Sequence, residues 1–396
     1  MNLRIEFVLS LLNRALPPLL ILGSISIFEK VLSGVEFTNY LLMYSFLMWV
    51  ISCFFQSQKN SIIKLCVARN KVNERVSVLY FYLVSLVSFF LVLFFYPVFE
   101  ALVLIIVIIV NGALYFFGAH LRLQAKTFLF ILTDTLAQVF KWLLAIAFVY
   151  FFSSVESVFI GFFLGAVAFV YLQYLNVDID GDICNVKRVD FYEYLKNIIP
   201  LLLLDLGISG FIYADRFFQQ IESTSTFIIA STISTQSVSI VAGTILMMIY
   251  PKISISYHHD RNKFLHLWKL TIKFSFFLIL SALPAISLGN WVISLLYNVE
   301  FKHDPIYLIT SLSLSHAIYY VFMCLAIPLI IVGQQIRVGV ILLFSLFLYL
   351  FFVFTFAIEE VLIVKLILMS SVTLVLFFYS ISTFLTFSKN DDIIDE

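Results

Sequence analysis

Residues 101–121 read ALVLIIVIIVNGALYFFGAHL, and this stretch decides the class of fold. It runs for about twenty residues without Asp, Glu, Lys or Arg, which is the length of a helix that crosses the hydrocarbon core of a bilayer. Inside lipid, every backbone N–H and C=O must be paired within the segment or within a barrel, and an unbroken apolar run fits a helix better than an alternating barrel strand. We therefore interpret the stretch as a membrane helix.

The rest of the chain repeats this pattern. Of its 396 residues, 62% are hydrophobic and 12% are charged, whereas a soluble domain carries about 25% charge. We predict an all-α, polytopic membrane protein with about twelve transmembrane helices. The expected ranges are Phe7–Phe28, Val35–Phe55, Val76–Phe95, Ala101–Leu121, Thr127–Phe152, Val158–Asn176, Ile198–Phe218, Phe227–Tyr250, Leu270–Leu288, Ile306–Val332, Val338–Phe356 and Val361–Phe387.

The connections between these ranges alternate in charge. Short cytoplasmic loops collect Lys and Arg, and here every second connection is basic. The basic set includes Lys64, Arg122, Lys187, Lys263 and Arg337, whereas the opposite set holds only Lys30 and Lys302. The pattern predicts that both termini face the cytoplasm.

The longest connection, residues 177–197, is expected to be a cytoplasmic linker between two six-helix lobes, residues 1–176 and 198–396. It contains Asp178-Ile179-Asp180-Gly181-Asp182, which imitates part of a calcium loop but lacks the later spacing and the bidentate Glu. We expect a solvated linker and no metal site. Glu29-Lys30 and Asp215-Arg216 occupy similar places in the two halves, so the chain resembles an internal duplication; a chance match of two dipeptides is the alternative.

Motifs for covalent chemistry are absent from the sequence. It holds no Gly-rich phosphate loop, no His-Glu-x-x-His run and no Gly-x-Ser-x-Gly elbow. The four cysteines have neither metal-ligand nor redox spacing and are expected to be unpaired thiols. We therefore predict that the protein is not an enzyme, with no catalytic residues and no cofactor.

Charged and polar residues within the apolar ranges are the candidate functional groups. A charge at mid-bilayer costs about 2.5–3.5 kcal/mol on insertion scales, so it tends to face a cavity or a partner. The candidates are the basic residues Arg14, Lys141 and Arg216 and the polar residues Asp134, Gln138, Asp205, Asp215 and His316.

Each candidate has an alternative interpretation. Arg14 and Arg216 lie near helix ends, where a long side chain can reach the interface. Asp134, Gln138 and Lys141 share one helix face, which predicts either a buried structural network or a polar stripe along a water-filled path. His316 is either a proton carrier or a hydrogen-bonded packing residue.

Three short segments resemble a known family. They are Asn13-Arg14-Ala15-Leu16-Pro17-Pro18-Leu19-Leu20, Tyr213-Ala214-Asp215-Arg216-Phe217-Phe218 and Tyr250-Pro251-Lys252-Ile253. With the twelve-helix plan and the short outer loops, they are similar to the O-antigen and polysaccharide repeat-unit flippases (the Wzx type) of the multidrug/oligosaccharidyl-lipid/polysaccharide (MOP) exporter superfamily.

The resemblance implies a V-shaped, pseudo-twofold pair of lobes in the bacterial inner membrane. It implies alternating-access transfer of undecaprenyl-pyrophosphate-linked oligosaccharides to the periplasmic leaflet, for O-antigen, lipopolysaccharide or other surface polysaccharide assembly. Arg14, Lys141 and Arg216 would then bind the pyrophosphate in a cationic cavity. Asp134 and Asp205 differ from this pattern, because their carboxylates would reduce the positive charge of the cavity. The implied partners are that lipid, membrane lipids, the polysaccharide polymerase and the chain-length regulator, and no nucleic acid.

Two other functions stay open at the level of sequence. One is a cation-coupled drug or metabolite exporter of the same superfamily. The other is a membrane polysaccharide polymerase or glycosyltransferase, although the short outer connections leave little room for a catalytic domain.

Overall fold

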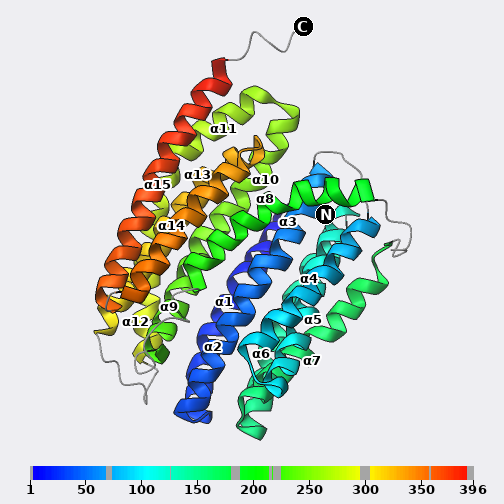
Figure 1. The fold of residues 1–396 in the computed structure, drawn as a ribbon, viewed down its shortest axis with the longest axis vertical. Coiled ribbons are helices and arrows are strands. Elements are labelled where there is room, and N and C mark those ends of the chain that lie inside the picture. Colours follow the sequence, from blue (N-terminus) through cyan, green and yellow to red (C-terminus); the bar gives the residue numbers. More distant parts are fainter. Residues whose placement is uncertain are drawn as a thin grey trace. The chain divides into compact units, whose positions relative to one another are not determined.

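The structure is a computed structural model that describes residues 3–67, 74–124, 126–179, 188–213, 216, 224–294, 304–355 and 358–389. Nearly all of these residues are helical, and no strand occurs among them (Figure 1). The all-α fold expected from the sequence is confirmed.

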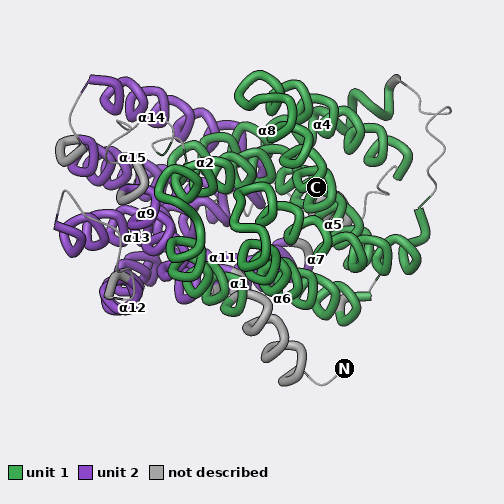
Figure 2. The backbone as a smooth tube through the Cα atoms, turned by 90° about the horizontal axis from the view of Figure 1, so that it is seen from below, with its two compact units in different colours: residues 1–217, 295–299 green, residues 218–294, 300–396 purple. Residues whose placement is uncertain are grey.

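The chain forms two compact units (Figure 2). Unit 1 comprises residues 1–217 and 295–299, and unit 2 comprises residues 218–294 and 300–396. Unit 1 contains α1 (Leu3–Val31), α2 (Gly34–Val50), the π-helical turn η1 (Ile51–Phe55), α3 (Gln56–Val67), α4 (Glu74–Phe95), α5 (Val98–Leu123), α6 (Thr127–Phe152), α7 (Val155–Leu175) and α8 (Arg188–Tyr213). Unit 2 contains α9 (Thr224–Val238), the π-helical turn η5 (Ser239–Gly243), α10 (Thr244–His259), α11 (Arg261–Phe274), the 3₁₀ segment η6 (Ser275–Ser281), α12 (Ala282–Ser294), α13 (Pro305–Ile331), α14 (Gln335–Thr355) and α15 (Ile358–Lys389).

Each of the twelve expected segments falls largely on helix. Within the described part of the chain, ten helices are long and apolar enough to cross a membrane. Their outer surfaces are apolar as well: Phe94 of α4 is 82% exposed and Phe151 of α6 is 78% exposed. Large phenylalanine faces of this kind suit contact with lipid rather than water. The chain is a multi-pass membrane protein.

Polar caps set several helix starts. The Ser33 hydroxyl accepts the backbone N–H of Glu36 at 3.3 Å, and the Glu36 carboxylate accepts the N–H of Ser33 at 3.2 Å, which makes a capping box at α2. The Asp260 carboxylate accepts the N–H of Lys263 at 2.9 Å at the start of α11. These caps satisfy N–H groups that lack partners in the first turn.

Helix α8 differs from its expected range. It begins at Arg188 rather than Ile198 and is described as far as Tyr213, whereas Phe218, the expected end, lies outside the described residues. Its first turns carry the polar sequence that the hydropathy pattern assigned to the linker, so the expected boundary was wrong there. Although α8 was expected to open the second lobe, it packs against α2, η1, α3 and α4 of unit 1.

The tightest helix pair in unit 1 is α6 with α7. A Cβ atom placed on Gly161 would lie 2.5 Å from the Ala145 Cα, and one on Gly165 would lie 2.5 Å from the Lys141 Cα. Glycine at these two positions lets the two backbones touch, which is a common basis of helix association in lipid.

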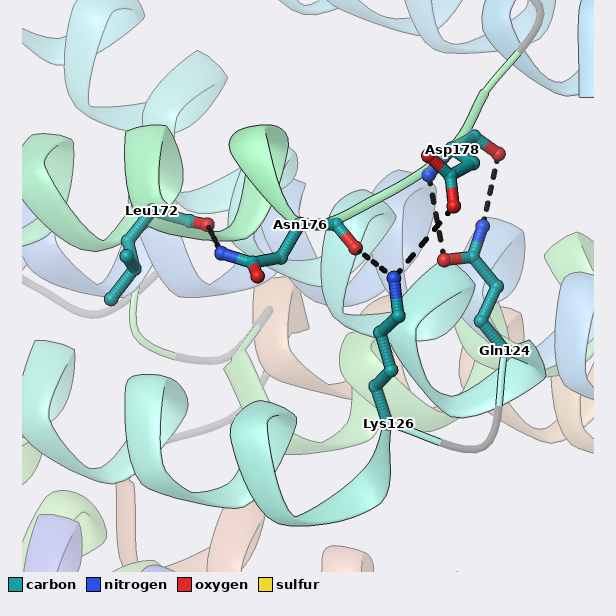
Figure 3. Close-up of polar contacts among 5 residues, drawn as sticks. All are labelled: Gln124, Lys126, Leu172, Asn176 and Asp178. Carbon is teal, nitrogen blue, oxygen red and sulfur yellow. Dashed lines mark hydrogen bonds and ion pairs between the residues drawn. The ribbon is translucent and has the colours of Figure 1, made fainter.

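At one end of unit 1, polar groups tie the turn after α5 to the segment after α7 (Figure 3). The Gln124 amide donates to the Asp178 carbonyl at 2.9 Å, and Lys126 Nζ donates to the Asn176 carbonyl at 2.6 Å. Lys126 Nζ lies 3.8 Å from the Asp178 carboxylate, which is 97% exposed. An ion pair so exposed contributes about 0–1 kcal/mol, so the two backbone carbonyl contacts matter more. Residues 180–187 lie outside the described part.

Candidate functional site

A polar seam runs along the contact of α8 with α2, η1 and α3. We define it by three residues on each side. They are Ser45, Cys53 and Asn60 on one side, and Arg216, Ser209 and Asp205 on the other. The residues pair in antiparallel order, so the seam follows α8 for most of its second half. The turn η1 carries Cys53, and a π-helical turn in a long helix often marks a functional site.

Arg216 lies just beyond the end of α8 and is 1% exposed. Its Nη1 donates to the Ser45 hydroxyl at 3.2 Å, and its guanidinium carbon lies 4.8 Å from the centre of the Tyr213 ring. The Tyr44 ring, also buried, packs edge-on to Trp142 at 5.7 Å. Aromatic faces attract a guanidinium and partly replace the water that it loses.

The middle of the seam is a short chain of hydrogen bonds. The Ser209 hydroxyl donates to the Asp205 carbonyl at 2.6 Å. Because that uses the hydroxyl proton, the Cys53 thiol is the donor in its 2.9 Å contact with the Ser209 oxygen. The contact holds η1 against α8.

Asp205 is the buried carboxylate of the seam. It is 7% exposed, and the Asn60 amide lies 3.5 Å from its Oδ2. Among the described residues, this amide is the one side-chain donor within hydrogen-bond reach of the carboxylate. A single long contact compensates poorly for removing a charged carboxylate from water.

Lys141 lies at a different interface, between α6 and α5. Its Nζ donates to the Asn111 Oδ1 at 2.8 Å, and the Asn111 amide donates to the Val107 carbonyl at 2.8 Å. Asp134 lies two turns earlier on α6, and Gln138 between them is half-buried. The hydrogen bonds of Lys141 thus go to Asn111 of α5, and both interpretations of the face shared by Asp134, Gln138 and Lys141, a structural network and a transport path, stay predictions.

The remaining candidates are distributed over both units. His316 is buried in unit 2, on α13, and contacts Thr235 of α9. Asp215 and the side chain of Arg14 lie outside the described residues, although Arg14 itself falls within α1. The structure thus brings Asp205 and Arg216 into one seam and places Lys141 and His316 elsewhere. Of the cysteines, Cys53 and Cys324 are buried, unpaired thiols as expected.

The sequence analysis did not identify the residues that hydrogen-bond to the charged groups Lys141, Asp205 and Arg216. Asn111 was visible as the one polar residue in the middle of the apolar run 101–121. Asn60 stood in a basic segment and was assigned to a loop, and Ser45 and Cys53 carried no distinguishing signal. Their importance depends on contacts with residues far away in the chain.

No protein-family model and no curated protein sequence matches the chain. Solved structures do match over nearly its whole length. A multidrug resistance MATE family transporter of the MOP superfamily, in an outward-facing conformation, matches with a TM-score of 0.69 and 14% identity, covering 97% of this chain and 96% of that one. A mutant of the Vibrio cholerae MATE transporter VcmN gives 0.69 and 12%, covering 96% of each chain.

A MOP superfamily transporter from Pyrococcus furiosus also matches, with a TM-score of 0.65, 15% identity and 95% coverage of each chain. That protein is described as having a binding pocket of reversed polarity, which suggests a different function for it. At these identities the likeness establishes the architecture and not the substrate. The chain has the two-lobed fold of the MATE transporters of the MOP superfamily.

Proposed function

We propose that this protein is a cation-coupled exporter that works by alternating access, and that Asp205 takes up and releases the coupling cation. The observation that carries the proposal is the Asp205 carboxylate, buried in a membrane helix with one long amide contact. An ionisable group in that position is costly unless it pairs or serves transport. A proton or Na⁺ arriving at Asp205 neutralises it.

The seam gives that cation a mechanical consequence. Asp205 and Arg216 stand at the two ends of the contacts that join α8 to α2, η1 and α3. When Asp205 is neutralised, the Asn60 amide no longer faces a charged carboxylate. Ser209, one turn after Asp205 on α8, is hydrogen-bonded to the Asp205 carbonyl and contacts Cys53 of η1. Cation binding therefore alters the attachment of α8, and a ligand that binds one arrangement better shifts the population toward it.

The first candidate substrate is a drug or metabolite. The similar solved structures favour it, because they are MATE transporters and one is described as a multidrug resistance transporter. In this case α8 moves with the cation, and the substrate occupies a cavity of loose specificity.

The second candidate is an undecaprenyl-pyrophosphate-linked oligosaccharide, with the polysaccharide polymerase and chain-length regulator as partners. One specific observation favours it: Arg216 is a nearly fully buried guanidinium beside the Tyr213 ring. A guanidinium binds pyrophosphate through paired N–H donors, and aromatic faces accommodate sugars. The sequence resemblance to the Wzx-type flippases points the same way.

Proteoliposomes with an imposed pH or Na⁺ gradient separate the candidates. One set carries a fluorescent cationic dye, and the other a fluorescent short-chain polyprenyl-pyrophosphate sugar. We expect Asp205→Asn to abolish gradient-driven transport of whichever probe moves, whereas Asp178→Asn, an exposed control, leaves it unchanged. Arg216→Ala should stop transport of the pyrophosphate probe, with partial rescue by Arg216→Lys, and spare transport of the dye. Gradient-driven transport by Asp205→Asn at the parental rate contradicts the proposal.

A cellular test addresses the same choice. Depletion of a flippase causes lipid-linked repeat units to accumulate, whereas depletion of a drug exporter lowers drug tolerance. Incorporation of labelled sugar into polymer by the purified protein would instead indicate a polymerase or glycosyltransferase and would contradict both candidates.

The proposed exporter lies in the bacterial inner membrane with both termini in the cytoplasm. The alternation of basic connections supports this orientation. Reporters fused after Lys64, Lys187 or Lys263 should give a cytoplasmic signal, and those after Glu100, Glu222 or Lys302 a periplasmic one. Two swapped signals would contradict the orientation.

A further inference from the structure

His316 joins two helices of unit 2 through a line of hydrogen bonds. It lies on α13 and is 2% exposed. Its Nδ1 is 2.7 Å from the Leu312 carbonyl, one turn earlier on the same helix. Its Nε2 is 2.8 Å from the Thr235 hydroxyl of α9, and that hydroxyl is 2.6 Å from the Ser231 carbonyl.

The protons available for this line can be counted. A carbonyl oxygen only accepts, so the Leu312 contact requires a proton on Nδ1 and the Ser231 contact requires the Thr235 hydroxyl proton. The Thr235 oxygen then has no proton left for Nε2, so the contact between them requires a proton on Nε2 as well. Three bonds need three protons, and a neutral imidazole with one hydroxyl supplies two. The imidazolium form supplies the third.

His120 in unit 1 provides a contrast. Its Nε2 lies 3.3 Å from the Ser77 hydroxyl, which donates to the Glu74 carbonyl at 2.8 Å. These two bonds need one ring proton and one hydroxyl proton, which the neutral histidine supplies. The hydrogen-bond partners of His316 therefore fit the imidazolium form, whereas those of His120 fit the neutral imidazole.

The contact between α9 and α13 is lined with hydroxyl groups rather than hydrocarbon alone. Ser234 of α9 donates to the Ile309 carbonyl of α13 at 3.3 Å. The buried hydroxyls of Ser231 and Ser313 have no hydrogen-bond partner among the described residues. Buried hydroxyl dipoles can orient toward an imidazolium and offset part of the cost of burying its charge.

The charges around α13 come from the helices packed against it. Helix α9, the segments η5 and η6, and α12 carry no charged or titratable side chain, and helices α10, α11 and α14 carry no carboxylate. On α15, Lys365 is buried with its ammonium 5.5 Å from the centre of the Tyr349 ring of α14, and the side chains of Glu359 and Glu360 lie outside the described part. The other titratable groups on α10, α11, α13, α14 and α15 are Tyr250, Lys252, Tyr257, His258, His259, Arg261, Lys263, His266, Lys269, Lys273, Tyr307, Tyr319, Tyr320, Cys324, Arg337, Tyr379 and Lys389.

We propose that His316, with Thr235 and the carbonyls of Leu312 and Ser231, is a proton-binding site of unit 2 whose protonation state decides whether the Thr235 hydroxyl donates to Ser231 within α9 or to His316 on α13. Loss of the proton removes one of the three bonds, because the Thr235 hydroxyl must turn from Ser231 to Nε2. The bond that is lost, between Thr235 and Ser231, lies within α9, which leads directly into the π-helical turn η5.

This site goes beyond the proposed function, which uses Asp205 of unit 1 for coupling. Its test measures the protonation of the His316 ring and does not depend on transport. An exporter coupled only through Asp205 would leave the site intact, and a protein that exports nothing would still bind the proton.

The test is nitrogen NMR of the full-length protein, labelled with ¹⁵N-histidine, in lipid nanodiscs between about pH 5 and about pH 8, the range in which histidine ordinarily titrates. The His316 signal is the one lost in His316→Gln, and the His120 signal is the one lost in His120→Gln. We expect both ring nitrogens of His316 to carry protons at the acid end and one at the alkaline end, with His120 holding a single proton over more of the range. A His316 ring with one proton at every pH overturns the proposal.

Substitutions at Thr235 test the proton count. Thr235→Val removes the acceptor for Nε2 and should weaken proton binding about tenfold, since a hydrogen bond to a charged group contributes about that factor or more. Thr235→Ser keeps the hydroxyl and should restore parental binding. Thr373→Val is the matched control, because it deletes a buried hydroxyl of α15 that has no hydrogen-bond partner among the described residues. Unchanged proton binding in Thr235→Val contradicts the site, and the parent spectrum decides the question even if that variant does not fold.

Discussion

Among the described residues, one helix in each unit carries a π-helical turn near its middle. In unit 1, 17 residues of α2 precede η1, which continues into α3. In unit 2, 15 residues of α9 precede η5, which continues into α10. The two helices differ in what they bind: the first contacts Asp205 and Arg216, whereas the second contacts His316 through uncharged hydroxyls.

The same backbone feature, a π-helical turn, thus lies in a helix that contacts a carboxylate and a guanidinium in unit 1 and in a helix that contacts an imidazole in unit 2. A π-helical turn adds a residue to a helix and rotates the residues beyond it, so the side chains before and after the turn can meet the same neighbour. In unit 1 the neighbour is α8 with its carboxylate and guanidinium, and in unit 2 it includes α13 with its imidazole. The internal duplication inferred from Glu29-Lys30 and Asp215-Arg216 stays a prediction, to which the two turns add a backbone feature.

The largest effect is expected from removing a π-helical turn. Deletion of Phe54 from η1 would rotate α3 by about 100° relative to α2, since each residue of a helix turns by that angle. Asn60 would then leave Asp205, and gradient-driven transport in proteoliposomes should fall to the level of empty vesicles.

Deletion of Ile240 from η5 is the matched change in unit 2. It rotates α10 relative to α9 but leaves Thr235, which precedes the turn, beside His316 of α13, so the His316 nitrogen signals should persist. If the Ile240 deletion removes those signals, or if the Phe54 deletion transports normally, the comparison between the two helices fails.

An intermediate effect is expected at the α6–α7 contact. In Gly165→Ala the new methyl would collide with the Lys141 backbone, so the helices must separate at a cost of about 1–3 kcal/mol. In Gly289→Ala of unit 2 the nearest atom is a side-chain methyl of Ile309 at 2.8 Å, which can turn away. Denaturation in nanodiscs should therefore rank Gly165→Ala below Gly289→Ala in stability.

Gly23→Ala is the control for this ranking, because nothing lies within 4 Å of the added methyl. It should leave stability unchanged or raise it slightly through better helix propensity. Equal losses in Gly165→Ala and Gly289→Ala would show that the two units are packed with the same tightness, contrary to this expectation.

The smallest effect concerns the pair of Lys141 and Asn111. Asn111→Leu leaves a buried ammonium without its 2.8 Å acceptor, whereas Lys141→Met together with Asn111→Leu removes both polar groups. The double variant should be the more stable of the two, with a coupling energy of about 0.6–1.7 kcal/mol in a double-mutant cycle. Additive losses would argue that the hydrogen bond contributes nothing.

The sequence predicted the helices far better than their contacts. Residues 127–152 were expected and found as one helix, because Lys126 and Ser153 bound an apolar run. The start of α8 was misplaced because Arg188 to Asn197 is polar although helical. The π-helical turns have no pattern in the sequence.

The candidate site was predictable only in part. Charges in apolar helices pointed to Asp205 and Arg216, since a bilayer penalises them wherever they lie. Their partners were not predictable, because Asn60 and Ser45 are separated from them by 145 and 171 residues and only folding brings them together. The line of bonds at His316 likewise needed the distance to Thr235.

Binding of a cation by Asp205 within the membrane can be tested by infrared difference spectroscopy without knowledge of the substrate. The parent protein in nanodiscs is titrated with acid and, separately, with Na⁺, beside Asp205→Asn and the exposed control Asp178→Asn. We predict a carboxyl band that changes with proton or Na⁺ concentration in the parent and in Asp178→Asn and is missing from Asp205→Asn. Identical difference spectra for the parent and Asp205→Asn under every condition would contradict cation binding at Asp205.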